Sequence, residues 1–174
     1  MKTLYSLFIV LIALTISSCS NLVYQKPVPQ HNQVLTTFPK NLQGTYVDSN
    51  QDTLFIYPRS YQYGKVGRMG SFSGELNKEL ILKNQGSYYF LNFQDNDGFW
   101  ELIGAKLDSN QLILYFVDIK TKEDVDIINS VIKKGKVKST RHEGKYVANP
   151  SGEEMIELFN HDFISEKSFL TKIR

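Results

Sequence analysis

The amino-acid sequence predicts a mainly β domain of the α+β class, in which an antiparallel meander of six to nine strands closes into a barrel or a curled sheet. Three observations predict this class. Short apolar runs recur between residues 44 and 118, several of them alternate in hydrophobicity with a period of two, and turn-forming residues separate them. Such runs are typical of up-and-down barrels. Two short helices interrupt the later part of the chain.

The first three strands of the meander are expected at 44–47, 53–57 and 60–66. Pro58 ends the second strand, because proline cannot donate a ladder hydrogen bond. Tyr61 and Tyr63 occupy alternate positions of the third strand, which places their rings on one face. Glycines then recur at positions 64, 67, 70 and 74, so this next segment is predicted to be a loop.

Four further strands are expected in the centre of the chain, at 79–83, 87–93, 99–107 and 111–118. Tyr89, Leu91 and Phe93 share one face of the second of these strands, because successive side chains point to opposite sides of a sheet. The pair Asp97-Gly98 is a strong hairpin signal and predicts a tight turn before the third.

Two helices are predicted from their capping residues. Thr121 offers a hydroxyl ahead of Glu123 and Asp124, and the helix dipole favours acids in a first turn. The pattern Ser151-Gly152-Glu153-Glu154 is a capping box for the second helix. Apolar residues follow each cap at helical spacing. One or two strands within 136–147 and a last strand at 168–173 complete the expected domain.

The N-terminal segment has the parts of a secretory signal. Lys2 supplies a positive end, and residues 4–16 supply an apolar run that is too short to span a bilayer. The stretch Ile16-Ser17-Ser18-Cys19 then resembles the lipobox of bacterial lipoproteins. The resemblance implies cleavage before Cys19, acyl chains such as palmitate on its sulfur and new amino group, and a mature protein that begins at this cysteine.

Three parts of the chain are therefore expected. Residues 1–18 would be a lipoprotein signal peptide, residues 19–40 a lipidated cysteine with a flexible tether, and residues 41–174 a single β-rich domain. Prolines at 27, 29 and 39 predict the tether, because proline favours extended and solvated backbone. The apolar side chains near its end, Val34, Leu35 and Phe38, are candidates to dock on the domain.

The residues after the lipidated cysteine also bear on the location. Cys19 is the only cysteine, so an exported form has no disulfide available. Residues 20–23 contain no acid, whereas an Asp at this point retains many Gram-negative lipoproteins at the inner membrane and an acidic run directs some to the cell surface. The resemblance therefore implies the outer membrane of a bacterium, with the protein facing the periplasm and anchored by its lipid.

Charge and histidine spacing argue against several classes of function. The net charge of +2 is too balanced to favour nucleic acid, and loss of Lys2 with the signal would lower it further. The histidines at 31, 142 and 161 lack the spacing of a zinc site, and no nucleophile-elbow motif occurs. We therefore expect no metal, no cofactor, no nucleic-acid partner and no enzymatic activity.

The tripeptide Gly44-Thr45-Tyr46 opens the first expected strand and is similar to the Gly-x-Trp motif of the lipocalin-like pattern. Tyr46 stands where that family has Trp, and the helices and later strands do not map onto it. The resemblance covers this tripeptide and the strand count. It implies an antiparallel barrel that holds one apolar ligand.

The expected function is binding by a membrane-anchored envelope lipoprotein. Either an apolar molecule would lie inside the barrel, or another envelope protein would bind its surface; a hydrolase of envelope polymers is the alternative. The aromatic candidates for the site are Trp100, Tyr89 and Tyr63. Trp100 is included because it follows the Asp97-Gly98 turn at a sheet end. The two binding modes differ in whether six side chains fill the interior or line a hollow: Tyr89, Leu91, Phe93, Leu112, Leu114 and Phe116.

Overall fold

The computed structural model describes residues 22–64, 71–139 and 145–174. Cys19 and the expected signal peptide lie outside the described residues. Within the described ranges the domain is mainly β, as expected, with one sheet and two helices. The strands are β1 (Leu22–Tyr24), β2 (Val34–Leu35), β3 (Gly44–Val47), β4 (Thr53–Ile56), β5 (Ser60–Tyr63), β6 (Phe72–Glu75), β7 (Leu80–Gln85), β8 (Tyr88–Gln94), β9 (Trp100–Asp108), β10 (Gln111–Val117), β11 (Lys138–Ser139), β12 (Tyr146–Ala148) and β13 (Ser165–Lys172), and the helices are α2 (Lys122–Val131) and α3 (Gly152–Phe159).

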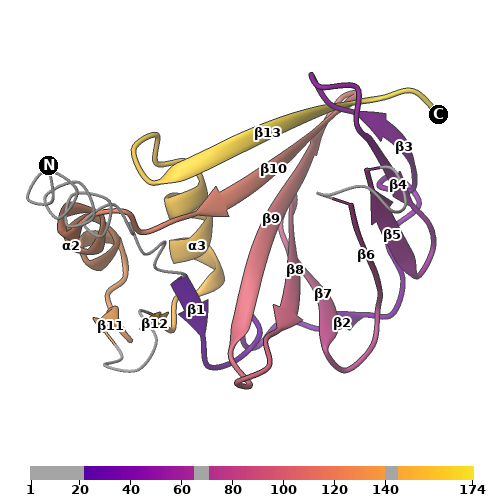
Figure 1. The fold of residues 1–174 in the computed structure, drawn as a ribbon. Helices are drawn as coiled ribbons and strands as arrows, with labels where there is room; N and C mark the ends of the chain where they lie inside the picture. The colour runs from indigo at the N-terminus through magenta and orange to yellow at the C-terminus, as the bar shows by residue number, and fades with distance from the viewer. Residues whose placement is uncertain (1–21, 65–70, 140–144) are drawn as a thin grey trace, which may run out of the picture.

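The sheet curls into a half-barrel (Figure 1). Its antiparallel path runs β7-β8-β9-β10-β13-β3-β4-β5-β6, with β2 added outside β7. The last strand, β13, joins the two halves of the curled sheet, because it pairs with β10 on one side and with β3 on the other. In the pairing with β3, Lys172 lies opposite Tyr46. In the part of the chain that the structure describes, β6 and β7 form no ladder, although residues 76–79 join them.

The two faces of the sheet have different neighbours. The outer face of β8, β9 and β10 is covered by α3, α2 and β1, seen at the left of Figure 1, and encloses the larger hydrophobic core. We call this side the helix-covered face. The inner face lies inside the curl and carries a second cluster, which includes Phe38, Leu82, Leu112 and Leu170. The site described below lies on this inner face.

Phe159 of α3 is the centre of the helix-covered core. Its ring centroid lies 5.2 Å from that of Tyr115, 5.7 Å from Phe90 and 6.2 Å from Tyr88. Beneath it, Gly104 of β9 leaves room for the ring, since a Cβ at this position would overlap the far end of Phe159. The close approach of helix and sheet therefore depends on a glycine that has ordinary backbone geometry.

Both predicted helices are present and capped. The Thr121 hydroxyl accepts from the Asp124 N–H at 3.2 Å, and the Asp124 carboxylate accepts from the Thr121 N–H at 2.7 Å. The capping box expected at the start of α3 is confirmed, because Ser151 Oγ accepts from the Glu154 N–H at 3.2 Å and the Glu154 carboxylate returns the bond at 2.8 Å. These bonds satisfy helix N–H groups that have no partner within the helix.

The N-terminal segment differs from the flexible tether that its prolines predict. Residues 22–38 lie against the domain: β1 pairs in parallel with β12, and Tyr24 meets Trp100 of β9. Val28 is fully buried, and Phe38 belongs to the inner cluster. The boundary expected at residue 41 is therefore too late, because the segment before it supplies two strands and buried side chains.

Two buried polar side chains hold this segment in place. Asn92 of β8 accepts from the Val28 N–H at 2.7 Å and donates to the Val28 carbonyl at 2.9 Å. The Lys83 ammonium of β7 donates to the carbonyls of Pro27, Pro29 and Gln30 at 3.3, 2.7 and 3.2 Å. Burial lowers the pKa of Lys83, and the three carbonyls match its three N–H donors. Proline removes an amide donor but leaves its carbonyl, which this lysine uses.

The number of strands exceeds the expected six to nine, because short strands escape a periodicity test. β6 lies in the segment whose glycines predicted a loop, and it pairs with β5 over four residues. Gly74 is part of this strand for a steric reason: a Cβ there would lie 2.7 Å from Leu80 and 2.9 Å from Tyr61. β1, β2 and β11 have only two or three residues each.

Candidate ligand-binding cavity

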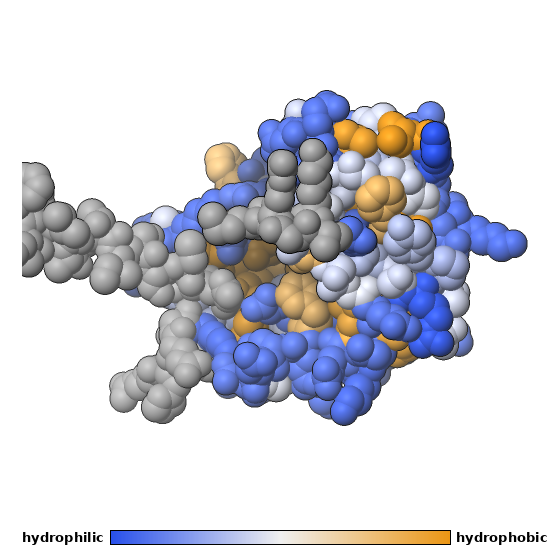
Figure 2. All heavy atoms as spheres, turned by 45° about the vertical axis from the view of Figure 1, so that its right-hand side comes forward, coloured by the Kyte–Doolittle hydropathy of each residue, from blue (hydrophilic) through white to orange (hydrophobic). Residues whose placement is uncertain are grey.

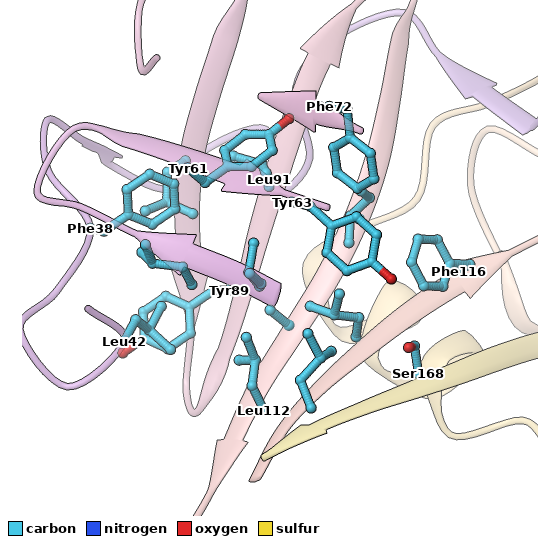
Figure 3. Close-up of a pocket in the computed structure, with 17 residues that line it drawn as sticks. Phe38, Leu42, Tyr61, Tyr63, Phe72, Tyr89, Leu91, Leu112, Phe116 and Ser168 are labelled. Carbon is cyan, nitrogen blue, oxygen red and sulfur yellow. The ribbon is translucent and has the colours of Figure 1, made fainter. Parts of the chain in front are cut away.

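A cavity of about 260 Å³ lies inside the curl. It exists because strand side chains alternate, so every second residue of β4, β5, β8, β9 and β10 points inward. Phe38 and Leu42, which precede β3, close one part of it (Figure 3). The seventeen lining residues are Phe38, Leu42, Leu54, Ile56, Tyr61, Tyr63, Phe72, Leu82, Tyr89, Leu91, Ile103, Ala105, Leu112, Leu114, Phe116, Ser168 and Leu170.

The cavity wall is apolar, and none of its lining residues carries a formal charge. Its side-chain polar atoms are the hydroxyls of Tyr61 and Tyr63 on β5, Tyr89 on β8 and Ser168 on β13 (Figure 3). Within the described ranges, the hydroxyls of Tyr61, Tyr89 and Ser168 make no hydrogen bond to protein. A ligand with one polar group can therefore find donors and acceptors without meeting a charge.

Aromatic rings of β5 and β6 form one wall. The Phe72 ring centroid lies 4.9 Å from that of Tyr63 and 6.0 Å from that of Tyr61. Phe72 is 48% exposed, so this wall is the boundary between the cavity and solvent. Exposed aromatic rings beside an apolar hollow are a common feature of ligand sites.

The Tyr63 hydroxyl is held by the turn between β3 and β4. It donates to the Asp48 carboxylate at 2.6 Å, and Asp48 also accepts from the backbone N–H groups of Asn50 and Asp52. The hydrogen bond to Asp48, with burial and the nearby carboxylate charge, raises the pKa of Tyr63 to about 12. The same bond lowers the pKa of Asp48. The phenol therefore stays neutral while its ring is fixed against the cavity.

Two clefts adjoin the cavity and share residues with it. The side cleft, of about 280 Å³, lies between β9 and the end of β10 and is lined by Leu22, Phe93, Glu101, Leu102, Ile103, Phe116, Val117, Asp118 and Glu166. The β6–β7 cleft, of about 550 Å³, lies between β6 and β7, which do not pair with each other in the described residues. Ile103 and Phe116 line the cavity and both clefts. Figure 2 shows apolar residues in a hollow on one face, with hydrophilic residues around it.

The structure separates the aromatic candidates. Tyr89 and Tyr63 line the cavity. Trp100 does not: it is 7% exposed, belongs to the helix-covered core and lies opposite Tyr24. Its position after a turn predicts that Trp100 is accessible, but β1 pairs with this end of β9 and Trp100 is buried. Lipidation of Cys19 lies outside the described residues.

The sequence analysis named six side chains that would either fill the interior of the barrel or line a hollow. All six lie at the cavity or at its clefts. Phe93 lines both clefts. The other five line the cavity itself: Tyr89, Leu91, Leu112, Leu114 and Phe116.

Several lining residues were not among the candidates taken from the sequence. Phe38 and Leu42 lie in or beside the expected tether, and Phe72 lies in the expected loop. The alternation of Tyr61 with Tyr63 was a usable signal, because it places both rings on one side of β5. Ser168 alternates with Leu170 along β13 in the same way.

In the residues that the structure describes, no three His, Cys, Asp or Glu side chains come together in a way that suits a metal ion. No described helix has both the length and the apolar character needed to cross a bilayer. No family model, curated protein or solved structure matches the chain.

Proposed function

We propose that this protein is a lipid-anchored lipoprotein of the bacterial envelope that binds one apolar molecule inside its half-barrel. The observation that carries the proposal is the uncharged cavity of about 260 Å³ on the inner face of the sheet. Apolar hollows with a few polar groups are typical ligand sites.

The size of the cavity limits the ligand. Its volume is about 260 Å³, and it joins the two neighbouring clefts at Ile103 and Phe116, where a longer chain would extend. The cavity therefore suits a single chain of medium length or a compact apolar molecule, and two long acyl chains exceed it. The hydroxyls of Tyr61, Tyr89 and Ser168 can bind one polar group of such a molecule.

The lipid anchor rests on the sequence Ile16-Ser17-Ser18-Cys19. Its resemblance to a lipobox, with no acid at residues 20–23, supports attachment to the outer membrane and a periplasmic orientation. Several acyl chains on Cys19 would give a stable anchor, because one chain alone binds a bilayer only marginally.

Binding inside the barrel is favoured over binding of an envelope protein on its surface. Five side chains that would have filled a solid interior line the cavity instead: Tyr89, Leu91, Leu112, Leu114 and Phe116. The hydrolase alternative lacks a specific observation in its favour, because the cavity wall offers hydroxyls and no carboxylate.

The proposal is tested with the non-lipidated chain, residues 20–174, and the probe N-phenyl-1-naphthylamine, whose fluorescence rises in apolar surroundings. We expect saturable binding that dodecanol displaces. Ala105→Phe puts a ring into the cavity and is expected to abolish binding, because Ala105 lines it. Thr171→Phe adds the same ring at an exposed position of β13 and is the matched control. Binding that is unaffected by Ala105→Phe would reject the cavity as the site.

A further inference from the structure

We propose that the ligand enters through the side cleft, and that the lipid on Cys19 holds this cleft against the bilayer, so that a single-chain lipid passes directly from the membrane into the cavity. This inference rests on the proposed function and adds to it the source of the ligand and its route.

The side cleft is a gap in the barrel wall. β9 pairs with β10 from Gly104 to Asp108 and then leaves it, although β8 continues beside β9 as far as Trp100. In the described part of the chain, Leu102 and Ile103 do not pair with β10, and β1 pairs with β9 only at Trp100. The wall therefore opens sideways at this place.

The gap leads to the cavity past two side chains. Ile103 and Phe116 line both the side cleft and the cavity, and neither is fully buried. Leu22, Leu102 and Val117 add apolar side chains to the approach, which they share with the carboxylates of the cleft. A chain that enters here would reach the cavity by passing between Ile103 and Phe116.

Leu22 connects the cleft to the anchor. It lines the side cleft, and β1 holds it there through its parallel pairing with β12. Three residue steps separate Leu22 from Cys19, and an extended chain spans at most about 3.6 Å per residue. The two Cα atoms are therefore within roughly 11 Å of each other. A flexible tether of twenty residues would impose no such limit, so the docking of β1 sets the orientation at the membrane.

The anchor itself does not fit the cavity. The resemblance to bacterial lipoproteins implies several acyl chains on Cys19, whereas the cavity has a volume of only about 260 Å³. The anchor chains therefore stay in the bilayer, and the cavity remains free for one separate chain.

Charges at the cleft specify the ligand further. The carboxylates of Asp118 and Glu166 line it, and Lys120 pairs with Glu166 from outside, with no basic side chain among the described lining residues of the cleft. Carboxylates at a mouth disfavour an anionic group. The transferred lipid is therefore a single-chain amphiphile with a neutral or cationic head, such as a long-chain alcohol or amine.

The orientation is tested with the full lipidated protein in phosphatidylcholine vesicles whose acyl chains carry bromine, which quenches nearby tryptophan. In a Trp100→Phe background, one variant carries Phe116→Trp at the cleft, and Val117→Trp is a second reporter there. Gln111→Trp, at the opposite end of β10, is the matched control. We expect quenching of the cleft reporters by at least half, and little quenching of the control.

A further variant carries a cleft reporter and inserts twenty Gly and Ser residues after Asn21, which frees the domain from the surface without changing β1. We expect this insertion to remove the quenching while binding of N-phenyl-1-naphthylamine by the non-lipidated form persists. Equal quenching at both ends, none at the cleft, or quenching that survives the insertion would overturn the inference alone. Loss of probe binding by the unaltered non-lipidated chain would overturn the proposed function instead.

Discussion

The two faces of β8 have similar sequences and different surroundings. Tyr88 and Phe90 point to the helix-covered face and are buried, whereas Tyr89 and Leu91 point inward and are only partly buried. The difference arises from what lies opposite. Phe159 of α3 packs against the first pair of rings, while the second pair faces a cavity. An apolar pattern that alternates with a period of two thus builds a solid core on one side and a ligand site on the other.

The polar residues of the same strands extend the comparison. Asn92 and Lys83 lie on the helix-covered face, are buried, and bind the backbone of residues 27–30. Around the cavity the side-chain polar atoms are hydroxyls, and those of Tyr61, Tyr89 and Ser168 make no hydrogen bond to protein in the described ranges. Buried hydrogen bonds therefore fix the N-terminal segment, whereas the cavity hydroxyls are available to a ligand.

The largest expected effect is on the free energy of unfolding, and it differs between two phenylalanines of β8. Phe90→Ala is expected to lower the free energy of unfolding by about 3–5 kcal/mol, because Phe90 is fully buried against Phe159. Phe93→Ala is expected to lower it by only about 1 kcal/mol, because Phe93 is partly exposed at the two clefts. Urea denaturation of the non-lipidated chain measures both. Equal losses would contradict the difference between the faces.

An asparagine pair tests the docking of the N-terminal segment. Asn92→Leu leaves the N–H and carbonyl of Val28 without their buried partner and is expected to lose about 1–3 kcal/mol of stability. Amide hydrogen exchange at Val28 should also become faster. Asn84→Leu is the matched control: it lies on the inner face of β7, next to Tyr89, and is expected to change stability by less than about 0.5 kcal/mol. If Asn92→Leu behaved like the control, residues 22–38 would be a tether after all.

The bond between Tyr63 and Asp48 predicts a pH dependence. Because the pKa of Tyr63 is raised from 10.0 to about 12 in the folded state, its contribution to stability is complete below pH 10 and is lost as the pH rises towards 12. The lowered pKa of Asp48 contributes stability above its ordinary value of 3.8, which is lost as the pH falls below it.

Tyr63→Phe removes this bond and keeps the ring. Wild type should therefore melt at a higher temperature than the variant at pH 7, and the gap should shrink both above pH 11 and below pH 3.5. Binding of N-phenyl-1-naphthylamine should survive the change, because the ring still lines the cavity. A gap that stays constant across this pH range would show that the bond does not form.

The smallest expected effect concerns the ligand's head group. Dodecanol and dodecylamine should displace the probe more effectively than dodecanoate, by roughly two- to fivefold, because carboxylates line the side cleft. Glu166→Gln should reduce this preference, whereas Glu153→Gln, which lies at the start of α3 and outside the cavity and the side cleft, should not. Tighter binding of dodecanoate would contradict the assigned ligand class.

The sequence correctly predicted which residues of a strand share a face. It did not predict which segments pack against each face. The alternation of Tyr89 with Phe90 assigns the two faces of β8 without a structure, and the caps at Thr121 and Ser151 locate both helices. Which face is solid depends on Phe159, some seventy residues away, and local pattern does not carry that distance. The tether was expected because prolines at 27 and 29 argue against regular structure, but Lys83 and Asn92 supply the hydrogen bonds that order this segment.

Two other differences are steric. Gly74 was expected to lie in a loop, yet it belongs to strand β6. Glycine suits this position because Leu80 and Tyr61 leave no room for a Cβ. Trp100 follows a turn and was expected to be accessible, but β1 covers it. Both depend on contacts between segments far apart in the chain.

The central claim is that the inner face of the sheet binds a ligand and the helix-covered face does not. Nuclear Overhauser effects between unlabelled dodecanol and the ¹³C-labelled methyl groups of the non-lipidated chain test it most directly. We predict contacts to Leu91, Leu112 and Leu114 of the cavity wall, and none to Ile128 or Leu158 of the helix-covered core. Contacts to the helix-covered core, or no contact to the cavity wall at saturating dodecanol, would contradict the account.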